Sequence, residues 1–131
     1  MKFMLVLWGD ESQWADMSEE ETAADMARWD DYTNQLIAAG ALVSGEGLQA
    51  STTAKTLRIE NGERIVTDGP FAETKEQLGG FYVIEVDSFD EALEWASKLP
   101  SAEYGSTEIR PVLAYEEMGI EDTQRPAEAR P

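Results

Sequence analysis

Acidic and basic side chains gather in one short stretch, Thr67–Glu76. A carboxylate such as Asp68 or Glu73 can abstract a proton from a carbon beside a carbonyl, and the Lys75 ammonium can stabilise the resulting enolate. Arg110 is a second candidate anion holder, because a guanidinium binds a carboxylate through two parallel hydrogen bonds. Asp68, Glu73 and Lys75 are therefore the catalytic candidates.

The same stretch also has a structural explanation, which we favour. Asp68-Gly69-Pro70 is typical of a turn, because Asp bonds nearby backbone, Gly tolerates unusual dihedral angles and Pro fixes φ. Thr74 and Gln77 have the spacing of a capping box, which predicts one helical turn over Lys75–Leu78.

A ligand site is predicted from side chains near this stretch and on two strands. Gly45 and Gly47 predict a bulge or a close backbone approach around Glu46, which could aim its carboxylate into a cavity. A solvated Glu46 on a bent edge strand is the favoured alternative, and for Arg110 the favoured alternative is an ion pair on a polar strand face. The candidate ligand-binding residues are Glu46, Asp68, Pro70, Phe71, Lys75 and Arg110.

Composition restricts the chemistry further. The 131 residues suit one domain and include neither His nor Cys, so the commonest general base and the thiol nucleophile are both missing. A net charge of −17 repels phosphate backbones and anionic lipids, so we expect neither a nucleic-acid nor a membrane partner. It also suits a solvated surface or, less favoured, an acidic docking face.

No cofactor or metal site is expected. Oxygen ligands are plentiful, but no loop has the acidic spacing of a calcium-binding loop and no Gly-rich phosphate loop is present. The apolar run Phe3–Trp8 is too short for a signal peptide or a membrane span, so we expect a cytoplasmic protein.

The first half of the chain predicts a strand, a helix and another strand. Lys2–Trp8 is apolar on both faces, and Asp10–Asp16 follows as a loop. A helix is expected from about Ser18 to Ala39, with Ser18 and Glu21 forming a capping box. The helix has one apolar stripe and ends at Gly40, before a strand over 41–48. The stripe comprises Met26, Trp29, Tyr32 or Thr33, and Leu36.

A β-hairpin follows. Strands Lys55–Glu60 and Glu63–Asp68 flank Asn61-Gly62, the strongest short signal for a two-residue type I′ turn. That loop length fixes the register and places Lys55 opposite Asp68, where the ammonium would hold the carboxylate ionised.

The second half predicts a strand over Phe81–Val86, a helix over Phe89–Leu99 and a last strand over Glu108–Tyr115. Ser88 and Glu91 form a further capping box. Pro111 makes the last strand an edge strand, because proline donates no backbone hydrogen bond. The segment 116–131 is expected to be a polar, mobile tail after a domain over 1–115.

These elements predict an α+β fold, a ferredoxin-like βαββαβ split sheet with an inserted β-hairpin. The strand order would be four, one, three, two, with the two strands that are apolar on both faces at the centre. The helices would cover one sheet face and leave the other bare and apolar. Because such a patch is large for a soluble monomer, we expect two copies to pack face to face.

One stretch also carries a resemblance. The nine residues Asp68–Glu76, followed by Leu78-Gly79-Gly80-Phe81, resemble the signature of the DGPF branch of YCII-related proteins. The resemblance extends from Met1 to about Pro111 and implies a dimeric α/β barrel with a cavity. DGPF-type proteins are also genomic neighbours of extracytoplasmic-function sigma factors, so the resemblance implies a regulatory or stress setting.

The chain departs from one pattern of this family. Other YCII-related proteins resemble enzymes with a His–Asp pair, but here those positions fall at about Trp29 and Leu99. Neither side chain carries a proton between groups, so the lyase mechanism suggested by that pair is not expected.

Three functions remain open. The preferred one is a dimeric small-molecule-binding protein with an accessory or regulatory role. The second is a His-independent lyase or isomerase that uses a carboxylate base. The third is an acidic interaction module whose first helix docks a basic partner.

Overall fold

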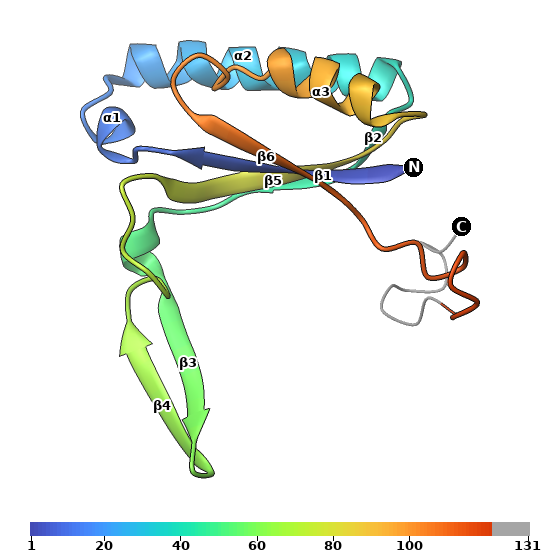
Figure 1. Cartoon of the computed structure of the whole chain (residues 1–131). Helices are drawn as coiled ribbons and strands as arrows, with labels where there is room; N and C mark the ends of the chain where they lie inside the picture. Colours follow the sequence, from blue (N-terminus) through green and yellow to red (C-terminus); the bar gives the residue numbers. More distant parts are fainter. Residues whose placement is uncertain (122–131) are drawn as a thin grey trace.

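The computed structural model describes residues 1–121. The chain folds around a four-stranded antiparallel sheet of order β2-β5-β1-β6. Helices α2 and α3 lie on one face of this sheet, and the hairpin β3–β4 projects from the other side (Figure 1). The elements are β1 (Lys2–Gly9), α1 (Ser12–Ala15), α2 (Glu19–Ala38), β2 (Leu42–Gly47), a 3₁₀ turn (Ser51–Thr53), β3 (Lys55–Glu60), β4 (Glu63–Asp68), β5 (Gln77–Glu85), α3 (Phe89–Ser97) and β6 (Ser106–Pro111).

The strand order confirms the predicted ferredoxin-like arrangement. β1 and β5 are the central strands and pair antiparallel over their whole length. β6 is an edge strand, as predicted, and its last residue Pro111 pairs with Phe3. The strand ends there, four residues before the predicted end, and one further backbone hydrogen bond follows it, from the Val112 N–H to the Lys2 carbonyl at 2.9 Å.

The long helix begins where its capping box predicts. The Ser18 hydroxyl accepts the Glu21 N–H at 3.1 Å, and the Glu21 carboxylate accepts the Ser18 N–H at 3.3 Å. Gly40 follows the helix with φ +70°, the left-handed conformation that ends many helices. Both ends of α2 are therefore determined by local sequence.

The second long helix is capped less completely. The Ser88 hydroxyl accepts the Glu91 N–H at 3.2 Å, but the Glu91 carboxylate accepts from Asp87 and not from Ser88. The predicted capping box is therefore half formed. α3 ends at Ser97, two residues before the predicted end.

The core lies between the helices and the covered sheet face. Its members are Phe3, Leu5, Tyr32, Leu36, Ala41, Ile84, Val86, Ala92, Ala96 and Leu99. The Tyr32 hydroxyl donates to the Trp95 carbonyl at 2.9 Å and joins α2 to α3. Met26, expected in the buried stripe of the first helix, is instead 56% exposed, so that stripe is narrower than predicted.

Two local predictions were wrong. The segment expected to be a loop over Asp10–Asp16 contains the short helix α1. The helical turn expected over Lys75–Leu78 does not form, because β5 already begins at Gln77. Thr74 and Gln77 instead bond within a bend: the Thr74 hydroxyl donates to the Glu76 carbonyl, and the Gln77 amide donates to the Thr74 carbonyl.

The hairpin has the predicted turn and register. Asn61 and Gly62 have φ of 51° and 79°, as a type I′ turn requires, and Lys55 pairs with Asp68. β3 and β4 form a separate two-stranded sheet that extends away from the body (Figure 1).

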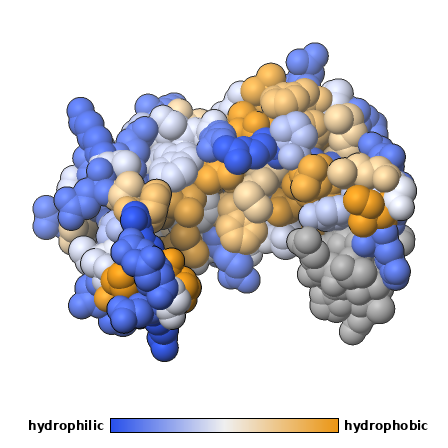
Figure 2. Space-filling model, turned by 60° about the horizontal axis from the view of Figure 1, so that its bottom comes forward, coloured by the Kyte–Doolittle hydropathy of each residue, from blue (hydrophilic) through white to orange (hydrophobic). Residues whose placement is uncertain are grey.

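No helix within residues 1–121 covers the second face of the main sheet. Met4 pairs with Val83 and Val6 with Phe81, and these side chains alternate with the buried Phe3 and Leu5. We call Met4, Val6, Phe81 and Val83 the free-face cluster. Figure 2 turns this side forward and shows hydrophobic side chains gathered across its middle.

No helix within residues 1–121 is long and apolar enough to cross a membrane. Most of the tail predicted from residue 116 onward lies outside the described residues. Its first part contains turns up to Gly119, where φ is +74°.

Candidate functional site

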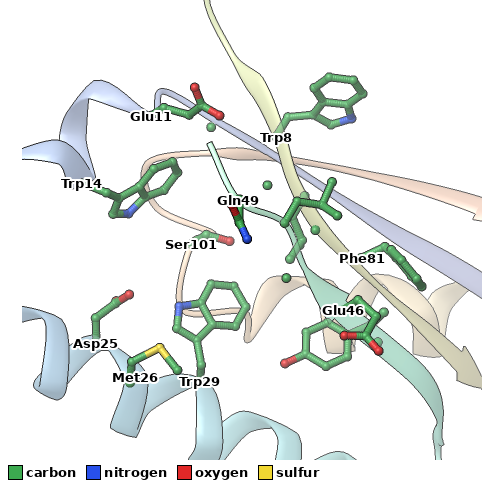
Figure 3. A pocket seen from close by; sticks show the side chains of 18 of the residues that line it. Trp8, Glu11, Trp14, Asp25, Met26, Trp29, Glu46, Gln49, Phe81 and Ser101 are labelled. Carbon is green, nitrogen blue, oxygen red and sulfur yellow. The ribbon is translucent and has the colours of Figure 1, made fainter. Parts of the chain in front are cut away.

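A pocket of about 920 Å³ lies between the helices and one end of the sheet. Trp14 of α1 and Trp29 of α2 line it from two sides, with Gln49 and Ser101 between them (Figure 3). Met26 extends the α2 side. We call it the main pocket.

The sheet side of the pocket is an ordered aromatic wall. Trp29 stacks on Tyr82, with ring centroids 6.4 Å apart and an interplanar angle of 16°. The Tyr82 hydroxyl shares a 2.7 Å hydrogen bond with the Thr33 hydroxyl, and Tyr32 packs edge-on at 5.4 Å. These contacts hold the Trp29 and Tyr82 rings in place without a bound ligand.

Trp14 is positioned by close packing against β1 and a distant loop. A Cβ added at Gly9 would lie 2.7 Å from the Trp14 ring, so the absence of a side chain there admits the indole. The ring of Tyr104 meets Trp14 at 6.4 Å in an edge-on arrangement. Burial first, and then the negative charge of Asp25, raise the pKa of Tyr104 above its usual range.

Glycines bring β2 close to this wall. A Cβ at Gly45 would lie 2.9 Å from the Tyr82 ring, and one at Gly80 would lie 2.6 Å from the Glu46 carbonyl oxygen. The pairing of β2 with β5 is irregular between Leu42 and Ser44. The irregularity lies before Glu46, so the bulge predicted around Glu46 is wrong, whereas the close backbone approach predicted there is confirmed at Gly80.

Two carboxylates at the pocket, those of Glu11 and Asp25, differ in their hydrogen-bond and ion-pair partners. Glu11 accepts the Ser51 N–H at 2.6 Å and the Ser51 hydroxyl at 2.7 Å, which ties the start of α1 to the 3₁₀ turn. Asp25 has a side chain only 21% exposed, and its nearest cationic atom is Arg28 Nη1 at 3.9 Å. Asp25 thus keeps much of its negative charge available.

Glu46 is the one predicted ligand-binding residue among those that line the main pocket within residues 1–121. It is exposed, pairs with Phe81 and lies beside that ring at the edge of the pocket (Figure 3). Its backbone, on an edge strand, helps to form the wall.

Lys75 lies at a second, smaller hollow of about 640 Å³ that Trp8, Asp10 and Glu76 also line. Hydrogen bonds from Ser12 are the main cause that lowers the pKa of Asp10, and the Lys75 charge acts in the same direction. Lys75 therefore lies near a carboxylate, but outside the main pocket.

The other predicted site residues line neither hollow in the described part of the chain. Asp68 makes the predicted pair with Lys55 at 2.6 Å. Arg110 pairs with Glu108 two residues earlier on β6, the ion pair that the sequence favoured. The catalytic and binding roles of these residues stay predictions.

The remaining three lie in the exposed segment between the hairpin and β5. Phe71 is 77% exposed, and the Arg58 guanidinium lies 5.4 Å from the centre of its ring. Pro70 and Glu73 are also exposed. The signature stretch therefore does not assemble one pocket.

Sequence reasoning missed most residues of the main pocket. Trp29 was expected only in the apolar stripe of the first helix, and Trp14, Gln49 and Ser101 were not considered. A lone Trp in the polar stretch Asp10–Asp16 was an available signal, because a large apolar ring seldom stays fully solvated. Among residues 1–121 no three acidic side chains come close enough together to hold a metal ion.

A family model described as the YCII-related domain matches residues 1–116. The chain belongs to the YCII-related family. A relative from Rhizobium meliloti (strain 1021), named "Uncharacterized protein R00369", is 43% identical over 117 residues, which is 88% of this chain and 94% of the relative. The family named from the signature stretch is thereby confirmed.

Membership in the YCII-related family makes two positions informative. Trp29, where the resemblance places a His in other members, is a wall of the main pocket. Leu99, where it places an Asp, is 3% exposed in the core. The positions of that pair thus hold one pocket-lining ring and one packing residue.

Proposed function

We propose that this protein is a dimeric small-molecule-binding protein with an accessory or regulatory role. The main pocket carries the proposal. Its volume of about 920 Å³ lies within the usual range for sites that enclose a small organic ligand. Its Trp14, Trp29 and Tyr82 walls are held in place by packing and a hydrogen bond.

Binding is favoured over turnover by the groups available. The chain has no His or Cys. Asp68 and Glu73, the candidate bases, line neither hollow in residues 1–121, and Arg110 is engaged by Glu108. A lyase or isomerase mechanism would therefore need another carboxylate as its base.

The dimer rests on the free-face cluster. Met4, Val6, Phe81 and Val83 form an apolar band on the two central strands, and no helix of the described residues 1–121 covers it. The flanking positions on the edge strands are polar: Ser44 and Glu46 on β2, Glu108 and Arg110 on β6. An apolar band with a polar rim suits a two-fold interface, in which each copy buries the same patch of the other.

The regulatory role rests on the resemblance to DGPF-type proteins and their sigma-factor neighbours. A binding protein without catalytic groups suits that setting, because occupancy of its pocket can report a metabolite concentration.

Native mass spectrometry of the purified protein tests this proposal. We expect twice the chain mass plus a constant small excess from a retained ligand. The released ligand is then incubated with fresh protein. Unchanged ligand supports a binding protein, and conversion of the ligand to a product would show instead that the protein is an enzyme. A bare monomer would overturn the dimer.

A substitution pair tests the interface separately. Val83→Asp adds a charge to each copy in the apolar band. We therefore expect the variant to sediment as a monomer at protein concentrations at which the parent protein sediments as a dimer. Ile37→Asp is the matched control, because Ile37 is an exposed aliphatic residue on α2. Circular dichroism checks that both variants fold. A Val83→Asp protein that remains dimeric would place the interface elsewhere.

A further inference from the structure

The charged side chains at the main pocket are all of one sign. Four carboxylate residues line it, and no Lys or Arg does so among residues 1–121. They are Glu11, Asp25, Asp30 and Glu46. Glu46 contributes mainly backbone, because its side chain lies on the same sheet face as Phe81, so the charge inside the pocket comes from the other three. The net charge of −17 adds to the negative potential there, so cations are concentrated at the mouth and anions are repelled.

The aromatic walls also favour a cationic ligand over an anionic one. Trp14 and Trp29 lie on two sides of the hollow (Figure 3), and Tyr82 stacks beside Trp29. The face of an aromatic ring attracts an ammonium group, and Trp does so best. The same rings and Met26 offer apolar surface to the rest of the ligand.

Asp25 is the carboxylate best placed to meet a charged group. Asp25 and Trp29 are four residues apart on α2 and therefore share one face of the helix, which Figure 3 shows on one side of the pocket. Arg28 neutralises Asp25 only in part, since its Nη1 is 3.9 Å away and its Nη2 donates to the Pro100 carbonyl at 3.1 Å. Glu11, by contrast, is occupied by Ser51.

We propose that the main pocket binds organic cations: molecules with one protonated amine or quaternary ammonium group on an apolar, ring-containing body. The ammonium lies between Asp25 and the Trp29 ring, and the apolar body fills the space towards Trp14. This inference rests on the proposed small-molecule function and names its ligand class.

Three probes of similar shape and different charge test it. They are 2-phenylethylamine, which is cationic at pH 7, neutral 2-phenylethanol and anionic 3-phenylpropionate. Titration calorimetry on the full-length protein should give the tightest binding for the amine. We expect roughly a tenfold loss for the alcohol, the size of effect that one cation–π contact with a nearby carboxylate provides, and a further loss for the anion.

Two matched variants locate the charge. Asp25→Asn should weaken amine binding roughly tenfold and leave alcohol binding within twofold, because only the cation loses an attraction. Asp31→Asn makes the same chemical change on α2 at an exposed residue that does not line the pocket, and should change neither. Melting temperatures of both variants show whether the fold is intact.

The outcomes separate this inference from the proposed function. If the alcohol or the anion binds as tightly as the amine, the cation class is overturned and a small-molecule pocket still stands. An equal loss of amine and alcohol binding in Asp25→Asn would also overturn the charge argument. If none of the three probes binds at millimolar concentration, both the ligand class and the pocket as a ligand site fail.

Discussion

Tyr32→Phe separates the stability of the fold from the shape of its pocket. Tyr32 is 3% exposed, and its hydroxyl donates to the Trp95 carbonyl at 2.9 Å. The carbonyl also accepts the Lys98 N–H at 3.2 Å, so the variant leaves it satisfied. The loss is therefore that of one net hydrogen bond, about 1 kcal/mol, which lowers the melting temperature of a chain this long by about 4 °C.

The same change should alter the response to alkali. Burial first, and then the neighbouring Tyr82, raise the pKa of Tyr32 well above its ordinary value of 10.0. The folded state thus holds the proton more tightly than the unfolded state. That stabilisation is complete below pH 10 and is lost as pH rises further, by up to about 1.4 kcal/mol for each pH unit. Phe at this position has no proton to lose, so the two stability curves converge above pH 10 and cross once the loss in the parent exceeds about 1 kcal/mol, within about one pH unit.

Urea unfolding followed by circular dichroism from pH 7 to 11.5, at fixed protein concentration, measures both effects. Tyr115→Phe is the control, because the Tyr115 hydroxyl makes no hydrogen bond to another residue in 1–121. Probe binding at pH 7 should be unchanged, since the Tyr32 ring still supports Tyr82. Equal stability of parent and Tyr32→Phe at pH 7, or equal slopes above pH 10, would refute this account of the buried hydroxyl.

Three further changes have defined outcomes. Gly45→Ala places a methyl group 2.9 Å from the Tyr82 ring and should cost about 1–3 kcal/mol of stability and weaken binding in the main pocket. Gly47→Ala has open space around it and should leave stability unchanged; an equal loss of stability in both variants would contradict this packing. Asp68→Ala removes an exposed ion pair and should lower stability in urea by less than about 1 kcal/mol; a larger loss would mean that the pair is not solvated. Ser18→Ala should cost about 1 kcal/mol in thermal unfolding through loss of the cap on α2, and an unchanged melting temperature would show that the cap adds nothing.

The topology of the fold was predictable because its signals are local and agree with one another. Asn61-Gly62 fixes a two-residue loop, and that loop alone fixes which residues of β3 and β4 pair. Pro111 marks an edge strand by its missing N–H group. Ser18 and Gly40 mark the two ends of α2. Each of these features depends on a few adjacent residues.

The errors arose where a short motif was read without its surroundings. Thr74 and Gln77 match a capping box, but Gly79 and Gly80 follow at once, and two glycines oppose helix propagation. Pairing with β1 offers that segment backbone hydrogen bonds that an isolated helical turn cannot supply. The segment therefore became the first part of β5.

The main pocket was less predictable than the fold for a different reason. The residues first considered were charged, close in sequence and set in one signature. The pocket walls are mostly apolar and come from separate elements, with Trp14 on α1, Trp29 on α2 and Tyr82 on β5. Their meeting depends on the packing of helices on the sheet, and no local pattern specifies it.

The aromatic wall of the pocket and the free-face cluster lie on opposite faces of the sheet, and only Phe81 of the cluster also borders the pocket, at its edge. Tyr82 faces Trp29 on the helix side, while its neighbours Phe81 and Val83 face the bare side, because side chains alternate along a strand. The two proposed functions should therefore be separable. We expect Val83→Asp to abolish dimerisation and keep amine binding, and Gly45→Ala to weaken binding and keep the dimer. Loss of both properties in either variant would mean that the partner copy helps to form the pocket, and that the alternation of β5 does not divide the two surfaces.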